Sequence, residues 1–152
     1  MDVSRIPIED MLPHRGGMLL LDGVLSFESK EVAAWATPRQ DTWYAEAAGM
    51  PNRIGIELMA QAIAAHVCLR YRSEGRPPRP GVLLGSRKYR CAAAHFAFGE
   101  RLVVRAAPSF QDDGGVAAYL CGIERAGAPL ATATVMVYEP EDFAAFLRRK
   151  TQ

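Results

Sequence analysis

The sequence predicts an α+β fold in which an antiparallel sheet wraps around one long central helix. The first observation is the element order: two strand-like segments, one long apolar segment, and then a run of strand-like segments separated by turns. The second is that the apolar segment, residues 52–71, is apolar on nearly all sides, which a surface helix is not. A sheet that curls around a buried helix satisfies both observations.

The first part of the chain predicts a hairpin. After a short amphipathic opening (residues 7–12), the apolar run MLLLDGV (18–24) has strand length, and EVAAWAT (31–37) follows it across the polar FESK turn. Residues 39–51 carry no clear periodicity and are expected to be irregular.

The central helix is predicted to run from about Asn52 to Tyr71. Pro51 disfavours any earlier start, and Asn52 is a residue type that caps helices. The segment RSEGRPPRPG, rich in proline and glycine, ends the helix.

Strand-like segments occupy most of the remaining chain. DDGG and AGA, which separate the last three of them, have the composition of hairpin turns, and EPEDFAAFLRRK (139–150) predicts a short closing helix. This order is that of the hot-dog fold, and its free sheet edge predicts a dimer. The strand-like segments are residues 82–91, 101–110, 116–125 and 129–139.

Composition indicates one globular domain spanning residues 1–152. The net charge is +1 and 49% of residues are hydrophobic, which disfavours disorder and nucleic-acid binding. No apolar run approaches the ~20 residues of a membrane span, and the first residues lack the layout of a signal peptide. Cys68, Cys91 and Cys121 are widely spaced among apolar neighbours, which favours buried, reduced thiols in a cytoplasmic protein over metal ligands or disulfides.

A glutamate interrupts the apolar helix. At 100° per residue, Glu57, Gln61, Ala64 and Cys68 share one face, whereas His66 lies on the opposite side and cannot pair with Glu57. A carboxylate among apolar side chains is expected to have a raised pKa, which suits a general acid or base. A structural glutamate satisfied by a local partner is an equally open interpretation.

Two motifs resemble those of the beta-hydroxyacyl-acyl carrier protein dehydratase family. They are LPHRGGMLLLDGV (12–24) and MPNRIGIELMAQA (50–62), and FGERL (98–102) is similar to a further turn motif of that family. The resemblance implies a hot-dog dimer with active sites at the interface. It also implies substrates on the phosphopantetheine arm of a carrier protein. Neither a metal nor another cofactor is expected.

The resemblance assigns roles to residues around the start of the helix. Glu57 matches the catalytic acid, Gln61 matches the helix amide, and Asn52 stands where the family has a glycine whose backbone N–H faces the thioester carbonyl. The catalytic histidine of the family has no counterpart, since its register falls at Trp43 and no histidine lies between His14 and Glu57. Elimination of water needs both a base and an acid, so activity does not follow from the resemblance alone.

Further residues complete the candidate substrate site and a carrier-docking surface. His14 belongs to the LPHR motif and is more typical of a structural histidine, while Trp43 and Tyr44 could line an acyl tunnel or plug it. His66 is expected in the core or at an interface, and His95 in a turn.

Seven bases and one acid lie between residues 70 and 90, a pattern typical of a solvated face that would also suit an acidic carrier protein. The docking candidates are Arg76, Arg79, Arg87 and Lys88.

Three functions remain open on this basis. The first is a dehydratase-like protein for carrier-bound 3-hydroxyacyl thioesters in fatty-acid or polyketide-type synthesis, with Glu57 as acid or base. The second is a hot-dog thioesterase, in which a helix carboxylate acts without a histidine. The third is a non-catalytic subunit that completes an active dehydratase heterodimer. Family members without the histidine are similar to dehydratase subunits of aryl-polyene-type pathways, where two unlike subunits occur together.

Overall fold

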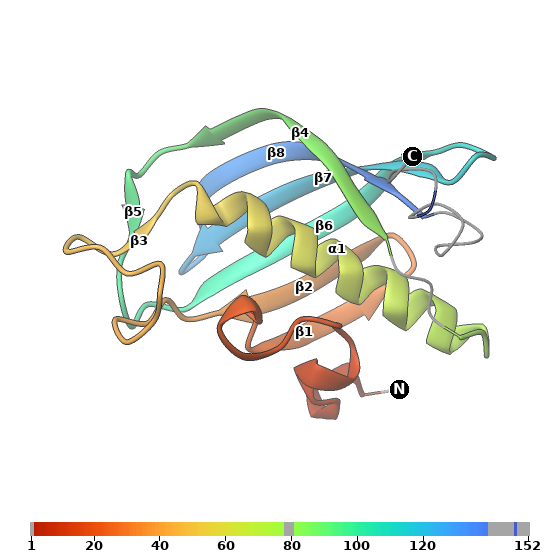
Figure 1. Ribbon diagram of the computed structural model, residues 1–152, viewed down its shortest axis with the longest axis horizontal. Coiled ribbons are helices and arrows are strands. Elements are labelled where there is room, and N and C mark those ends of the chain that lie inside the picture. The colour runs from red at the N-terminus through yellow and green to blue at the C-terminus, as the bar shows by residue number, and fades with distance from the viewer. Residues whose placement is uncertain (1, 78–80, 140–147, 149–152) are drawn as a thin grey trace.

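The computed structural model describes residues 2–77, 81–139 and 148, and it has the predicted α+β architecture. One long helix, α1 (Ile54–Ser73), lies across the inner face of a six-stranded antiparallel sheet that curls around it (Figure 1). This arrangement is the hot-dog fold. The strand order is β1-β2-β6-β7-β8-β4, with β1 (Gly23–Glu28), β2 (Glu31–Ala36), β4 (Val82–Cys91), β6 (Leu102–Gln111), β7 (Val116–Arg125) and β8 (Ala128–Tyr138).

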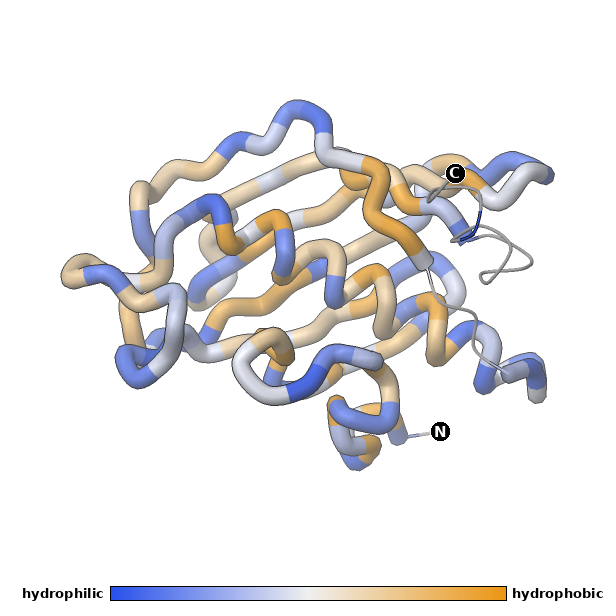
Figure 2. The backbone as a smooth tube through the Cα atoms, viewed as in Figure 1, coloured by the Kyte–Doolittle hydropathy of each residue, from blue (hydrophilic) through white to orange (hydrophobic). Residues whose placement is uncertain are grey.

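Smaller elements flank this sheet. Three short 3-10 turns lie at the N-terminal end (Val3–Arg5, Ile8–Asp10 and Gly16–Met18). Strands β3 (Met50–Pro51) and β5 (His95–Phe96) pair with each other next to the start of α1. Figure 2 shows hydrophobic residues along α1 and the strands, and hydrophilic residues at the turns and at the C-terminal end of α1.

The first strand was predicted too early in the chain. Residues 19–22 belong to no strand, because the backbone N–H groups of Leu20 and Leu21 donate to Oε1 of Gln61, at 2.9 and 3.3 Å, instead of to a neighbouring strand. The pairing of β1 with β2 extends to Glu28 and Glu31, so the hairpin turn is Ser29–Lys30, and the preceding residues of FESK belong to β1.

The helix start was also placed too early. Asn52 does not cap α1, since its side-chain amide donates to the carbonyl of Ala93 (3.1 Å) and the capping position is held by Arg53 without a side-chain hydrogen bond. The predicted closing helix lies almost entirely outside the described residues. Of the three cysteines, all free thiols, only Cys121 is fully buried, so the expectation of three buried thiols is wrong for Cys68 and Cys91.

His66 is the core histidine that the sequence indicated. Its ring is fully buried against Phe27 and Tyr119, and Nε2 lies 3.2 Å from the carbonyl oxygen of Glu28 and 3.1 Å from that of Ser29. Two carbonyl acceptors require a proton on Nε2, so Nδ1 accepts the hydrogen bond from the Tyr119 hydroxyl at 3.1 Å. The ring thus joins α1 to the β1–β2 turn and to β7.

We predict that this histidine makes folding stability depend on pH. Burial lowers the pKa of His66, because desolvation outweighs the hydrogen bonds from its ring to the two carbonyls. A group whose pKa is lower in the folded state stabilises the fold above its unfolded pKa, about 6.5, and that contribution is lost as the pH falls below this value. Urea unfolding at pH 7.5 and 5.5 measures the loss. His66→Asn should show a smaller loss than wild type, and equal losses would contradict the assignment.

Candidate active site

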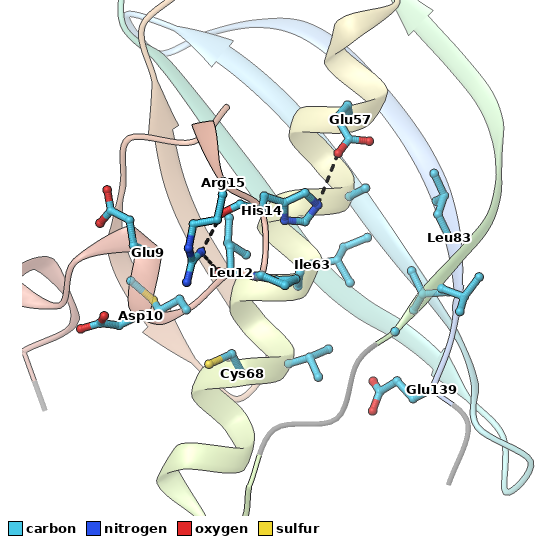
Figure 3. A pocket seen from close by; sticks show the side chains of 18 residues that line it. Glu9, Asp10, Leu12, His14, Arg15, Glu57, Ile63, Cys68, Leu83 and Glu139 are labelled. Carbon is cyan, nitrogen blue, oxygen red and sulfur yellow. Dashed lines mark hydrogen bonds and ion pairs between the residues drawn. The ribbon is translucent and has the colours of Figure 1, made fainter. Parts of the chain in front are cut away.

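A groove runs along the one side of α1 that is not packed against the sheet. It has a volume of about 480 Å³ and lies between the N-terminal segment 9–15 and the start of β4 with the end of β8 (Figure 3). Its floor is apolar and comes from α1: Ala60, Ile63, Ala64 and Val67. Glu57 and Cys68, both lining residues, are separated by about 16 Å along the helix axis. Burial raises the pKa of the Cys68 thiol, which disfavours a nucleophilic thiolate there.

Glu57 points into this groove from the first turn of α1. Its side chain is 34% exposed in the single chain, so the expectation of a deeply buried carboxylate is wrong. The reason is local, because Leu58 and Met59 face the core, whereas Glu57 lies on the side of α1 that lines the groove. Its Oε1 accepts a hydrogen bond from Gln61 at 3.1 Å.

Gln61 is fully buried and connects Glu57 to the N-terminal segment. Its Nε2 donates to the carbonyl of Met18 (2.7 Å) as well as to Glu57, while its Oε1 accepts from Leu20 and Leu21. Every polar atom of the amide therefore has a partner, as a buried amide requires. Through these bonds Gln61 holds the carboxylate and the segment after His14 against each other.

His14 is the residue that the structure adds beside Glu57. Its Nε2 lies 3.7 Å from Oε1 of Glu57, and its Nδ1 is buried without a hydrogen-bond partner among the described residues. The Arg15 guanidinium donates to the carbonyls of Leu12 (2.6 Å) and His14 (2.7 Å), which fixes the backbone at this point. The sequence placed His14 among the candidate substrate-site residues, but favoured a structural histidine for it and predicted no contact with Glu57. A signal for this contact was present in the sequence. The LPHR motif is followed closely by residues 18–21, whose backbone Gln61 binds.

Three other candidates lie outside the groove lining of the described chain. The Trp43 indole, 57% exposed, donates from Nε1 to the carbonyl of Gly17 (2.6 Å), and the buried Tyr44 hydroxyl accepts from the N–H of Arg39 (2.9 Å). The backbone N–H of Asn52 donates to the carbonyl of Ala94 at 3.0 Å. A part for Asn52, Trp43 and Tyr44 in substrate binding stays a prediction.

Near Asn52, a tyrosine ties β4 to the start of α1. The Tyr89 hydroxyl donates to the carbonyl of Asn52 at 2.6 Å, and burial raises the pKa of this phenol. A side chain at Gly55 would collide with the same hydroxyl, so only glycine allows β4 to come this close.

The basic residues of segment 70–90 do not form one continuous patch. Arg70 pairs with the buried Glu139 at 3.4 Å, and Arg76 pairs with Glu74, while Arg79 lies outside the described residues. Arg87 and Lys88 are exposed on a bulge of β4 and form no ion pair within the described part of the chain. Lys88 adopts a positive φ of 55°, which marks the bulge.

Two further findings concern the described ranges 2–77, 81–139 and 148. Within them, the structure contains no group of three or more His, Cys, Asp or Glu side chains that could hold a metal ion. The helices found there include none that is long and apolar enough to cross a membrane.

The curled sheet around α1 defines a protein of the hot-dog class. A family model described as ApeP dehydratase matches residues 6–148, so the chain belongs to the ApeP-like dehydratase family. A search of the curated proteins found no match.

Solved structures agree with this fold. The chain is similar to the dehydratase heterocomplex ApeI:P from Xenorhabdus doucetiae, with 25% identity and a TM-score of 0.84, covering 93% of this chain and 96% of that one. AziG of S. sahachiroi is 12% identical with a TM-score of 0.62, covering 79% of this chain and 90% of its own. A Helicobacter felis protein, the HP0420 homologue, is 11% identical with a TM-score of 0.65, and the match covers 90% of this chain and 91% of the H. felis chain. The last two show likeness of fold alone.

Proposed function

We propose that the chain acts on 3-hydroxyacyl thioesters held on an acyl carrier protein, with Glu57 as the residue that transfers the proton. The observation that carries this proposal is a carboxylate opening into a groove whose floor is apolar. An acyl chain fits such a floor, because burying its methylene groups against Ala60, Ile63 and Val67 is favourable. A carboxylate beside the thioester end can move the proton that elimination of water requires.

A partner subunit is part of the proposal. β4 lies at a free edge of the sheet, and Leu83 and Leu84 on it are exposed in the single chain. A free edge with exposed leucines supports pairing with a second copy or with a related dehydratase subunit. The heterocomplex named ApeI:P supports the second of these. In such a pair, this chain could also serve as a non-catalytic subunit, which the missing family histidine favours.

We predict that Glu57→Gln keeps the fold and abolishes most of the turnover. The substitution preserves size and the contact with Gln61 but removes the group that accepts a proton, so kcat should fall by about 10²–10⁴-fold with a melting temperature near that of wild type. The assay incubates the purified chain with a 3-hydroxyacyl-carrier thioester and follows loss of water. Glu100→Gln, which changes an exposed carboxylate that pairs with Arg125 outside the groove, is the matched control.

The same assay separates the alternatives. Release of free thiol without loss of water would identify a thioesterase. No turnover by the chain alone, restored by a partner that has its own histidine, would identify a non-catalytic subunit. A Glu57→Gln variant with unchanged turnover and reduced stability would show that Glu57 is a structural residue.

The β4 bulge is the proposed docking surface for the carrier. Arg87 and Lys88 are exposed and form no ion pair with any residue that the structure describes. Tyr89, which follows them in β4, contacts the start of α1, where Glu57 lies. A negatively charged carrier that bears a phosphorylated arm suits this charge. Arg76, by contrast, is already paired with Glu74, so we expect a smaller part for it.

We predict that the double variant Arg87→Glu, Lys88→Glu raises KM for the carrier-bound substrate by about tenfold and leaves kcat near wild type. The KM of wild type should also rise with salt, because the contact is screened. Lys30→Glu, an exposed charge reversal in the β1–β2 turn, is the control and should change neither value. An unchanged KM in the double variant would place the docking surface elsewhere.

A further inference from the structure

We infer that His14 binds the substrate oxygen as a neutral hydrogen-bond donor through Nε2–H, while Glu57 alone carries the proton during elimination. The inference rests on the proposed function and names the division of labour within that site. It begins from the 3.7 Å between Nε2 of His14 and Oε1 of Glu57, and from the buried Nδ1 of His14.

The two ring nitrogens of His14 lie in different surroundings. A neutral imidazole has one N–H donor and one acceptor nitrogen. A proton on Nδ1 would be a buried donor without an acceptor among the described residues, which is costly, and it would leave the Nε2 lone pair facing a carboxylate. A proton on Nε2 faces Glu57 and the groove instead. The surroundings therefore favour the Nε2–H form.

The separation of His14 and Glu57 leaves room for a substrate oxygen. At 3.7 Å the two atoms are too far apart for a direct hydrogen bond, whereas one oxygen about 2.8 Å from each would bridge them. Oε1 of Glu57 is also bound by Gln61, and Oε2 receives no hydrogen bond within the described segments. Oε2 is thus the free oxygen of the carboxylate.

The proton balance then needs no second residue, because Glu57 acts first as the base and then as the acid. The Glu57 carboxylate removes the C2 proton, the electron pair of that C–H bond forms the C2–C3 double bond, and the C3–O bond breaks. Glu57 returns the same proton to the departing hydroxyl, which leaves as water, and the carboxylate is restored. The Nε2–H of His14 stays on the ring and stabilises the negative charge that develops on the departing oxygen.

Matched variants of the full chain test this division. His14→Gln can still donate a hydrogen bond through its amide, so its kcat should stay within about tenfold of wild type. His14→Phe cannot donate one, and its kcat should fall by about 10²–10³-fold, the effect of losing one donor to a developing oxyanion. His95→Gln changes a histidine that pairs with Glu46 outside the groove and should leave turnover unchanged. Equal losses in His14→Gln and His14→Phe would show that a hydrogen bond donated by His14 does not assist turnover and would overturn the inference.

A spectroscopic measurement decides the tautomer without relying on activity. Long-range ¹H–¹⁵N spectra at pH 8, where an ordinary histidine is neutral, distinguish Nε2–H from Nδ1–H rings. The chain has only three histidines, and His66 is an internal reference because its carbonyl partners require Nε2–H. His14 should match His66, and an Nδ1–H signal for His14 would overturn the inference. Absence of wild-type turnover would refute the proposed function instead, and the spectra would still decide the tautomer.

Discussion

Burial of one apolar helix is the constraint on which the rest of this molecule depends. α1 has buried residues on most of its circumference, and a curled antiparallel sheet covers them. The stripe through Glu57, Ala60, Ala64 and Cys68 is only partly covered and lines the groove. The groove therefore results from a curled sheet that covers most, but not all, of the helix surface, and whatever occupies the groove contacts α1.

Gln61 converts that packing into a defined site. A buried amide must satisfy its donors and its acceptor, and here it does so with the backbone of residues 18–21 and with the Glu57 carboxylate. The N-terminal segment is thereby held at the groove with His14 facing Glu57. Trp43 supports the same turn through its hydrogen bond to Gly17, which gives a structural function to the residue that stands in the register of the family histidine.

Much of the fold could be predicted because its signals are local. Segments 82–91 and 116–125 coincide with β4 and β7, where turn residues bound runs of strand-forming residues, and the helix ends within two residues of its predicted limits. The first strand was misplaced because Gln61, some forty positions away, binds the backbone of Leu20 and Leu21. Contacts made by a distant side chain leave no periodic pattern.

The site could be predicted only in part, for the same reason. The stripe of Glu57 and Gln61 follows from helix geometry and is confirmed by their hydrogen bond. The pairing of Glu57 with His14 depends on how the segment before β1 crosses α1, which neither residue spacing nor composition reports.

The measurement that tests the central claim most directly is a structure of the protein with an inert 3-hydroxyacyl-pantetheine analogue, in which an amide replaces the thioester. The account predicts that the acyl chain lies along Ala60, Ile63 and Val67, with its C3 oxygen within hydrogen-bonding distance of both Glu57 and the Nε2 of His14. An analogue bound away from this groove, or with its C3 oxygen remote from Glu57, would contradict the account.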